Sequence, residues 1–325
     1  MRQQKGRPAL LADRRILVLA QYARTGGTRT YALRLLDFLV NHGAFVVMVG
    51  DSYENDLEFP SIVANLGIEF IDIRDLTADS LGRSATSRSS FRSKRRKDLE
   101  AECVTRLVNL RAINQVITSV GSPGALIKIT GIVNDSIYLL HTYPHGIRSA
   151  VRSWLDRRSR LGPGTRVVTV SDYSKNRIIQ RWHLPAEQCL SVRSTAGDVM
   201  EQAPLRGASP QVLTVGHVER YKDPFLWIRV AHEVLKVSEL EDTRFVWLGE
   251  GSLLQACRAQ VQKLGMETQI LFPGAVQDVG ACYDESDLYL QLSSVESLGL
   301  GVLDAARRGI PQVVTGVGGL SEAVE

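Results

Sequence analysis

The sequence has no run of about 18 consecutive apolar residues, the length that a membrane-spanning helix requires. Its opening residues, MRQQKGRPALLADRR, also lack the apolar core of a signal peptide. These two absences predict a cytoplasmic protein. Of the 325 residues, 44% are hydrophobic and 23% are charged, so the chain has the composition of a globular protein and is long enough for two domains with separate cores.

Cysteine is also scarce: the chain has four, and no two of them form a Cys-x-x-Cys pair. This spacing argues against a disulfide framework and against a cysteine zinc site, so we expect small buried thiols. The formal net charge of +4 is modest for this length. No nucleic-acid partner is therefore expected.

Short apolar runs typical of buried parallel strands alternate with helical patterns along the chain. This alternation predicts an α/β fold with Rossmann-like parallel sheets. We expect one domain over 1–200, a linker with prolines over 201–210, and a second domain over 211–325. The expected strands are 15–20, 44–50, 68–73, 136–141, 166–170, 189–193, 211–216, 244–248, 269–272 and 287–292, and the expected helices include 59–66, 98–117 and 298–308.

Residues 74–97 interrupt this alternation, because they are rich in serine and arginine and almost free of apolar side chains. Such a segment buries too little surface to order itself, so we expect a mobile basic insertion. One functional interpretation is that residues 82–97 contact an anionic membrane surface from the cytoplasmic side. The alternative is a solvated basic loop.

Two expected strands end in residues that suit a ligand. Gly26 and Gly27 separate the first strand from a helix, where backbone amides can meet an anionic or hydroxylated group; a plain tight turn is the alternative. His141 ends the apolar run 136–141, at the sheet edge where doubly wound domains bind ligands. Its alternative is an ordinary hydrogen-bonded histidine, and His145 is a second candidate nearby.

Two carboxylates stand in the stretch LQLSSVESLGLGVLDAARRGIPQVVTGVGGLSE, which begins at residue 290. Asp304 follows Glu296 by eight residues, about two helical turns, so we expect both on one helix face roughly 12 Å apart. Gly299, between them, leaves amides uncovered near a helix start. This pattern suits a sugar, a diphosphate and a ribose. The alternative is that both acids are solvated helix residues.

The same stretch resembles the nucleotide-sugar signature of the retaining GT-B glycosyltransferases of family four, which reads Pro-Ser, Glu-Gly-Phe-Gly and Glu-Ala-x-Ala-x-Gly-x-Pro-Val-Val. Ser297 replaces the first glycine, and Asp304 replaces the second glutamate. The resemblance implies that Glu296 contacts the donor sugar, that Asp304 holds the ribose hydroxyls, and that the amides near Gly299 and Leu300 meet the diphosphate. The matching residues are Ser294, Glu296, Gly299, Ala305, Gly309, Pro311, Val313 and Val314.

A second stretch resembles the family's Gly-Arg-Leu-x-x-x-Lys-Gly, with Gly216 and Lys222 in matching positions. The resemblance implies that Lys222 neutralises the donor diphosphate. His217 stands where the family has arginine, and Arg220 is close enough in sequence to supply the missing charge. A lysine at a helix start is otherwise unfavourable, which itself argues for an anionic partner.

The turn Gly249-Glu250-Gly251 matches the family's Gly-x-Gly beside the nucleotide. The resemblance also places the loop of Gly26 and Gly27, together with His141, at a central cleft between two Rossmann-like domains whose parallel sheets face it. It implies a GT-B enzyme without a metal, and the chain has no Asp-x-Asp motif.

The resemblance implies a retaining hexosyltransferase that uses a nucleotide-diphospho-sugar, with no separate cofactor, and a glycan or lipid-linked acceptor in cell-surface polysaccharide or glycoconjugate synthesis. A sugar-nucleotide epimerase and a catalytically silent GT-B-like partner subunit are the alternatives. In that family more chain follows the last motif, so we expect the second domain to be incomplete at Glu325.

Overall fold

The computed structural model describes residues 10–20, 27–50, 58–76, 90–118, 135–141, 164–193, 209–276 and 278–324. The chain divides into two compact units, of which the first comprises residues 1–169 and 175–191 and the second comprises 170–174 and 192–325. None of the helices within the described ranges has the length and apolar content to cross a lipid bilayer. The expected linker lies mostly outside the described residues. Residues 77–89 of the basic insertion also lie outside them.

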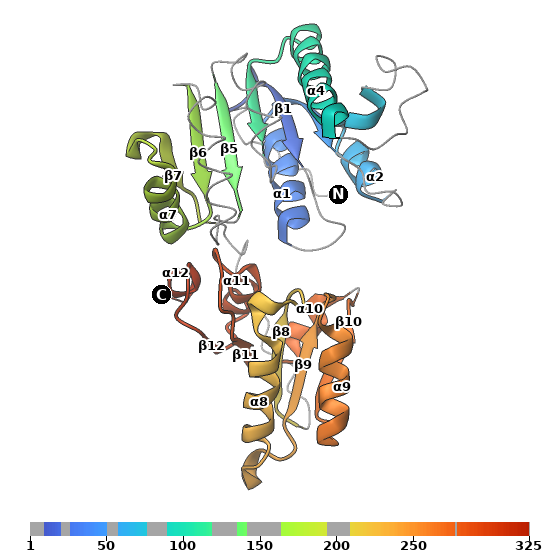
Figure 1. Ribbon diagram of the computed structural model, residues 1–325, viewed down its shortest axis with the longest axis vertical. Helices are drawn as coiled ribbons and strands as arrows, with labels where there is room; N and C mark the ends of the chain where they lie inside the picture. The colour runs from blue at the N-terminus through green and yellow to red at the C-terminus, as the bar shows by residue number, and fades with distance from the viewer. Residues whose placement is uncertain are drawn as a thin grey trace. The chain divides into compact units, whose positions relative to one another are not determined.

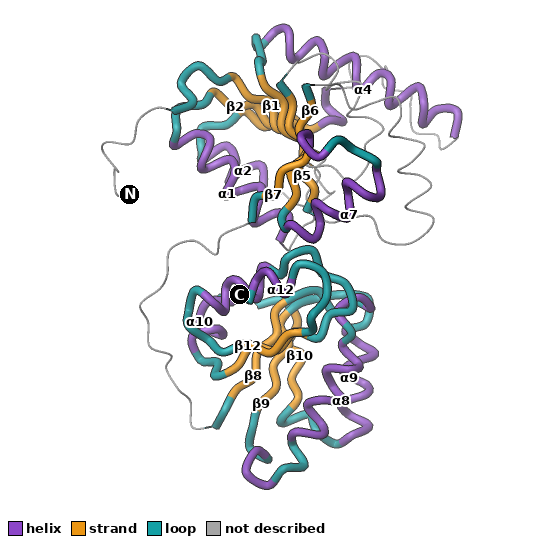
Figure 2. The backbone as a smooth tube through the Cα atoms, turned by 90° about the vertical axis from the view of Figure 1, so that its left-hand side faces the viewer, coloured by secondary structure: helices purple, strands orange, loops and turns teal. Residues whose placement is uncertain are grey.

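The first unit is built on a seven-stranded parallel sheet in the order β3-β2-β1-β4-β5-β6-β7. Helices α1 and α2 cover one face and α4 covers the other, as Figure 2 shows. The strands are β1 (Arg15–Ala20), β2 (Phe45–Gly50), β3 (Glu69–Asp72), β4 (Gln115–Thr118), β5 (Ser136–Leu140), β6 (Thr165–Thr169) and β7 (Cys189–Ser191); the helices are α1 (Gly27–Asn41), α2 (Glu58–Asn65), α4 (Ser90–Leu110) and α7 (Asp172–Trp182).

The second unit has a five-stranded parallel sheet in the order β10-β9-β8-β11-β12 (Figure 1). Helices α8 and α9 pack on one face, and α10, α11 and α12 pack on the other. The strands are β8 (Gln211–Val215), β9 (Arg244–Leu248), β10 (Ile270–Gly274), β11 (Leu288–Gln291) and β12 (Gln312–Val314); the helices are α8 (Pro224–Val234), α9 (Leu254–Leu264), α10 (Val279–Asp284), α11 (Leu300–Ala306) and α12 (Leu320–Ala323).

An aromatic core under α8 fixes the second sheet. Trp227 on α8 is fully buried, and its ring lies 5.3 Å from that of Trp247 on β9 and 5.5 Å from that of Phe272 on β10. Side chains of this size each remove on the order of 150 Å² or more from water. The strands are therefore held rigidly, and their carboxyl ends form a stable edge for the loops that follow.

Two expectations for the first unit are wrong in part. The helix expected over 98–117 ends at Leu110, and Gln115–Thr118 forms β4 instead. Ala112 adopts a positive φ of 50°, which stops the helix without the glycine that usually marks such a stop. Residues 90–97, which we expected in the mobile insertion, begin α4. Arginine and lysine have a high helix propensity, which the low apolar content of the segment does not reflect.

Candidate functional site

Two glycine turns pack directly on each other at the carboxyl ends of β8 and β9. The amide of Gly216 donates to the carbonyl of Leu248, and the amide of Val218 donates to the carbonyl of Glu250, each over 2.9 Å. A Cβ on Gly249 would overlap the Gly216 carbonyl, and a Cβ on Gly251 would overlap that of Val218. Both glycines are thus needed for the close approach of the two turns.

The loop that carries Lys222 is anchored at two further points. The carboxylate of Glu219 accepts hydrogen bonds from the Ser252 amide and hydroxyl, both at 2.7 Å, and these bonds hold the pKa of Glu219 below its usual value. The indole of Trp247 donates to the Gly216 carbonyl over 3.0 Å. Hydrogen bonds to Trp247 on β9 and to Ser252 therefore hold the loop that carries Lys222.

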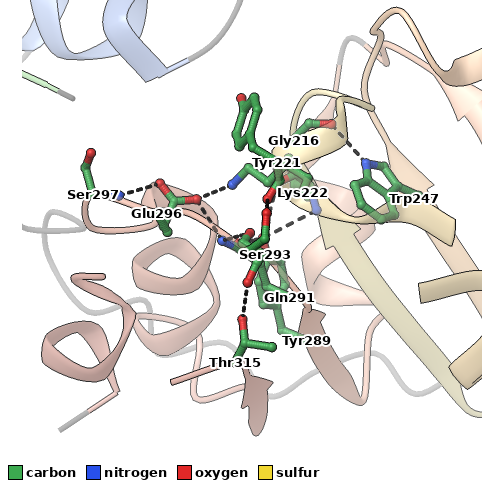
Figure 3. A network of polar contacts seen from close by, with 12 residues as sticks. Gly216, Tyr221, Lys222, Trp247, Tyr289, Gln291, Ser293, Glu296, Ser297 and Thr315 are labelled. Carbon is green, nitrogen blue, oxygen red and sulfur yellow. Dashed lines mark hydrogen bonds and ion pairs between the residues drawn. The ribbon is translucent and has the colours of Figure 1, made fainter. Parts of the chain in front are cut away.

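Lys222 forms an ion pair with Glu296, which lies 74 residues later in the chain (Figure 3). Only 12% of the lysine side chain and 15% of the glutamate side chain are exposed. The Glu296 carboxylate also accepts from the Gln291 amide at 2.9 Å and from the Ser297 backbone amide at 3.1 Å. One cation and one fixed carboxylate thus lie together at the edge of the sheet.

A loop from β11 delivers Glu296 to this place. Ser294 donates from both its amide and its hydroxyl to the carbonyl of Tyr221, at 2.8 and 3.0 Å, so the loop after β11 is fastened to the residue before Lys222. β8 and β11 are neighbours in the sheet, with Tyr289 opposite Leu213. Parallel pairing of these strands brings their following loops together, which explains a contact that spans so much sequence.

The expectation that Glu296 and Asp304 share one helix face is wrong. Helix α11 begins at Leu300, and Gly299 before it adopts a left-handed conformation with φ of 93°. Glu296 therefore lies in the preceding loop, and Asp304 lies within the helix. The glycine breaks the helical spacing on which the expectation depended.

A second pair of glycines, Gly318 and Gly319, sets the backbone of this loop. The amide of Gly319 donates to the Glu296 carbonyl over 3.1 Å. A Cβ on Gly318 would overlap that same carbonyl, and a Cβ on Gly319 would overlap the carbonyl of Ser297. The sequence pattern included both glycines but gave them no role. Their role in the structure is to let the turn after β12 lie against Glu296.

Asp304 lies near two buried tyrosines. Burial raises the pKa of Tyr283 and of Tyr289 well above the usual value, and the negative charge of Asp304 contributes to both shifts. The hydroxyl of Tyr283 donates to the Gly301 carbonyl at 3.0 Å. These charge interactions place Asp304, on α11, close to Tyr283 and Tyr289.

Arg220 is exposed on the loop before Lys222, and His217 is partly buried on the same loop. Arg220 therefore adds a positive charge to the loop that carries Lys222. Within the described ranges, no group of three histidine, cysteine or carboxylate side chains could hold a metal ion.

In the first unit, His141 follows β5 and packs edge-on against Tyr31 of α1, with ring centroids 4.5 Å apart. Burial lowers the pKa of His141 to about 4, so the imidazole is neutral near pH 7. Gly27 is the first residue of α1, and Gly26 lies outside the described residues. The structure thus joins Gly216, Lys222, Gly249, Gly251 and Glu296 into one site of the second unit, whereas His141 and Gly27 belong to the first.

Sequence comparison relates the second unit to known proteins. Residues 198–325 match the family described as Glycosyl transferases group 1. The Vi polysaccharide biosynthesis protein VipC/TviE of Salmonella typhi is 34% identical over 112 residues, which cover 34% of this chain and 19% of that protein. N-acetyl-alpha-D-glucosaminyl L-malate synthase of Bacillus anthracis is 32% identical over 96 residues, which cover 30% of this chain and 25% of that protein. The matched stretches therefore span a quarter or less of these relatives.

Structural comparison covers both units. Anabaena HepE, solved in complex with UDP-glucose, has a TM-score of 0.72 at 15% identity, and the match covers 96% of this chain and 83% of that one. A glycosyltransferase from Rickettsia africae has a TM-score of 0.72 at 14% identity and covers 95% of this chain and 81% of that one. The predicted α/β fold is confirmed. The chain has the GT-B fold, and its residues 198–325 match the glycosyl transferases group 1 family.

Proposed function

We propose that this protein is a retaining glycosyltransferase that moves a hexosyl group from a nucleotide-diphospho-sugar to a glycan or lipid-linked acceptor. The observation that carries the proposal is the pairing of Lys222 with Glu296 at the edge of the second sheet. A diphosphate needs a cation, and sugar hydroxyls need a fixed acceptor. The two groups, side by side, match the two halves of such a donor.

In the proposed reaction, the bond between the anomeric carbon and the diphosphate oxygen breaks, and a bond to the acceptor oxygen forms on the same face. The acceptor's hydroxyl proton passes to the departing phosphate oxygen. Lys222, with Arg220 nearby, stabilises the negative charge that develops on the leaving group. Glu296 holds the sugar hydroxyls and so fixes the orientation of the anomeric carbon. The proposed reaction uses these charges and no cofactor.

The remaining site residues take supporting roles in this proposal. Asp304 would accept hydrogen bonds from the ribose, and the turns at Gly249 and Gly251 would lie along the nucleotide. The neutral imidazole of His141 can donate and accept one hydrogen bond each, which suits a hydroxyl group better than a phosphate.

The acceptor class is proposed from the relatives. The family comprises glycosyltransferases, and the Salmonella typhi relative is a polysaccharide biosynthesis protein. A lipid-linked glycan acceptor would bring the protein to the cytoplasmic surface of a membrane. The basic sequence over 82–97 suits an anionic surface there, although its side chains lie outside the described residues.

Nucleoside diphosphate release from a panel of UDP-, GDP- and ADP-sugars tests the proposal, with the anomer of the first sugar product followed by proton NMR. We expect release from one class of donor and a product that keeps the donor's anomeric configuration. Tight binding of a nucleoside diphosphate without release from any donor would favour the silent partner subunit. An inverted product would contradict retention.

A further inference from the structure

A chain of buried polar groups lies beneath Glu296 on β11. Gln291 is 2% exposed and Tyr289 is fully buried. The Tyr289 hydroxyl lies 3.2 Å from the Gln291 side-chain oxygen and 3.4 Å from the Val215 amide. The Gln291 side-chain nitrogen lies 2.9 Å from Glu296 Oε2 and 3.2 Å from Ser293 Oγ (Figure 3).

The Glu296 carboxylate determines which way the Gln291 side-chain amide is oriented. An ionised carboxylate only accepts, so Gln291 must present its amide hydrogens to Glu296 and its oxygen to Tyr289. The Tyr289 hydroxyl has two acceptors at 3.2 Å, the Gln291 side-chain oxygen and the Val215 carbonyl, and it accepts from the Val215 amide. The series joins the carboxyl end of β8 to the carboxylate of Glu296.

The side chains of Gln291 and Tyr289 are costly to bury, and the fold leaves space for them. A leucine at position 291 would fill the same strand without burying an amide, whereas a buried amide is tolerated only with its hydrogen bonds made. A Cβ on Gly301 would overlap the Tyr289 hydroxyl, so that glycine leaves space for the phenol. Core packing alone gives no reason for these polar groups.

The two oxygens of Glu296 differ in their partners. Oε2 accepts from both Lys222 and Gln291, and Oε1 accepts from the Ser297 amide. A carboxylate oxygen accepts about two hydrogen bonds, so Oε1 has room for one more donor. When a donor diphosphate attracts Lys222, Gln291 remains as the side chain that holds Oε2.

We propose that Gln291, supported by Tyr289, is a positioning residue that keeps Glu296 aimed at the donor sugar after Lys222 turns to the diphosphate. This inference rests on the proposed function. It predicts that Gln291 affects recognition of the sugar and leaves recognition of the nucleoside diphosphate unchanged.

The test compares Gln291→Leu with Gln211→Leu in the full chain, using the nucleotide-sugar that the wild type hydrolyses. Gln211 is a matched control, because it is 8% exposed and bonds Ser286 at the opposite end of the same sheet. We expect Gln291→Leu to lower kcat/KM for the nucleotide-sugar about 10- to 100-fold, the effect of losing a hydrogen bond to a charged group. The Kd for the nucleoside diphosphate should stay within about twofold of the wild type, and Gln211→Leu should change neither value.

A second variant, Gln291→Glu, keeps the shape and adds a readout that a packing role would not produce. The introduced carboxyl can donate to Glu296 only while it is protonated, and two neighbouring carboxylates raise one pKa. Its activity relative to wild type should therefore rise as the pH falls, and that of Gln291→Leu should not.

Three results would overturn the inference, and they distinguish its failure from failure of the proposed function. No hydrolysis by the wild type would overturn the proposed function and this inference with it. An active wild type with kcat/KM unchanged in Gln291→Leu would overturn this inference alone. A parallel loss of nucleoside diphosphate affinity in Gln291→Leu would show general damage to the site and would also overturn it.

Discussion

Replacement of Glu296 by glutamine should tighten the binding of a free nucleoside diphosphate, although it removes a residue of the proposed donor site. In the structure, the Lys222 ammonium is paired with Glu296. A diphosphate must take Lys222 away from that carboxylate, and it also meets the carboxylate's negative charge. Glutamine removes both obstacles, and it keeps the volume of the side chain.

The magnitude follows from the burial of the pair. Exposed ion pairs contribute at most about 1 kcal/mol, but these side chains are 12% and 15% exposed. A hydrogen bond to a charged group at that depth is worth about 1.5 kcal/mol or more, which corresponds to roughly tenfold in Kd. We therefore expect the Kd for the nucleoside diphosphate to fall about tenfold in Glu296→Gln.

Isothermal titration calorimetry with the nucleoside diphosphate of the active donor measures this change. Glu250→Gln is the matched control, because Glu250 is an exposed carboxylate on the neighbouring glycine turn and makes no ion pair with Lys222 among the described residues. An equal gain in both variants would show that general charge, and not the ion pair, controls affinity. Unchanged or weaker binding by Glu296→Gln would show that the ion pair does not compete with the diphosphate for Lys222.

Two further predictions concern stability. Gly319→Ala should lower the free energy of unfolding by about 1–3 kcal/mol, because its Cβ would overlap the Ser297 carbonyl. Gly316→Ala is the control and should be close to neutral, because nothing lies within 4 Å of a Cβ there. Thermal melts of the two variants measure the difference. His141 has a folded pKa of about 4 against an ordinary value of 6.5, so the unfolded chain binds more protons between these values and stability falls as the pH drops through them. The loss approaches about 3 kcal/mol below pH 4, and His141→Gln should flatten that part of the stability profile in urea titrations; an unchanged profile would contradict the assignment.

Strands buried on both faces were the most predictable part of the fold. RILVLA at residue 15 is a continuous apolar run, and it forms β1 with the predicted bounds. β4 was missed because its four residues follow α4 closely and extend the helical pattern of apolar positions. The stop between them depends on a left-handed alanine, Ala112, for which the sequence carries no glycine signal.

The sequence indicated which residues form the candidate site but not how their side chains lie relative to one another. Motif resemblance singled out Lys222 and Glu296, but their pairing depends on β8 and β11 being neighbours, which local sequence does not reveal. Gln291 was missed, because one polar residue in the run LYLQL reads as an ordinary strand position. The sequence feature that could have indicated Gln291 is a polar side chain at the carboxyl end of a run that is otherwise apolar or aromatic.

The role of the pair of Lys222 and Glu296 is tested by the rate of nucleoside diphosphate release from the preferred nucleotide-sugar by the wild type, Lys222→Ala and Glu296→Ala, with Gly316→Ala as the folding control. Both site variants should lose at least about 100-fold in kcat/KM, since each removes a charge that acts on the donor, and the control should retain wild-type activity. Release at the wild-type rate by either site variant would show that the pair does not act on the donor.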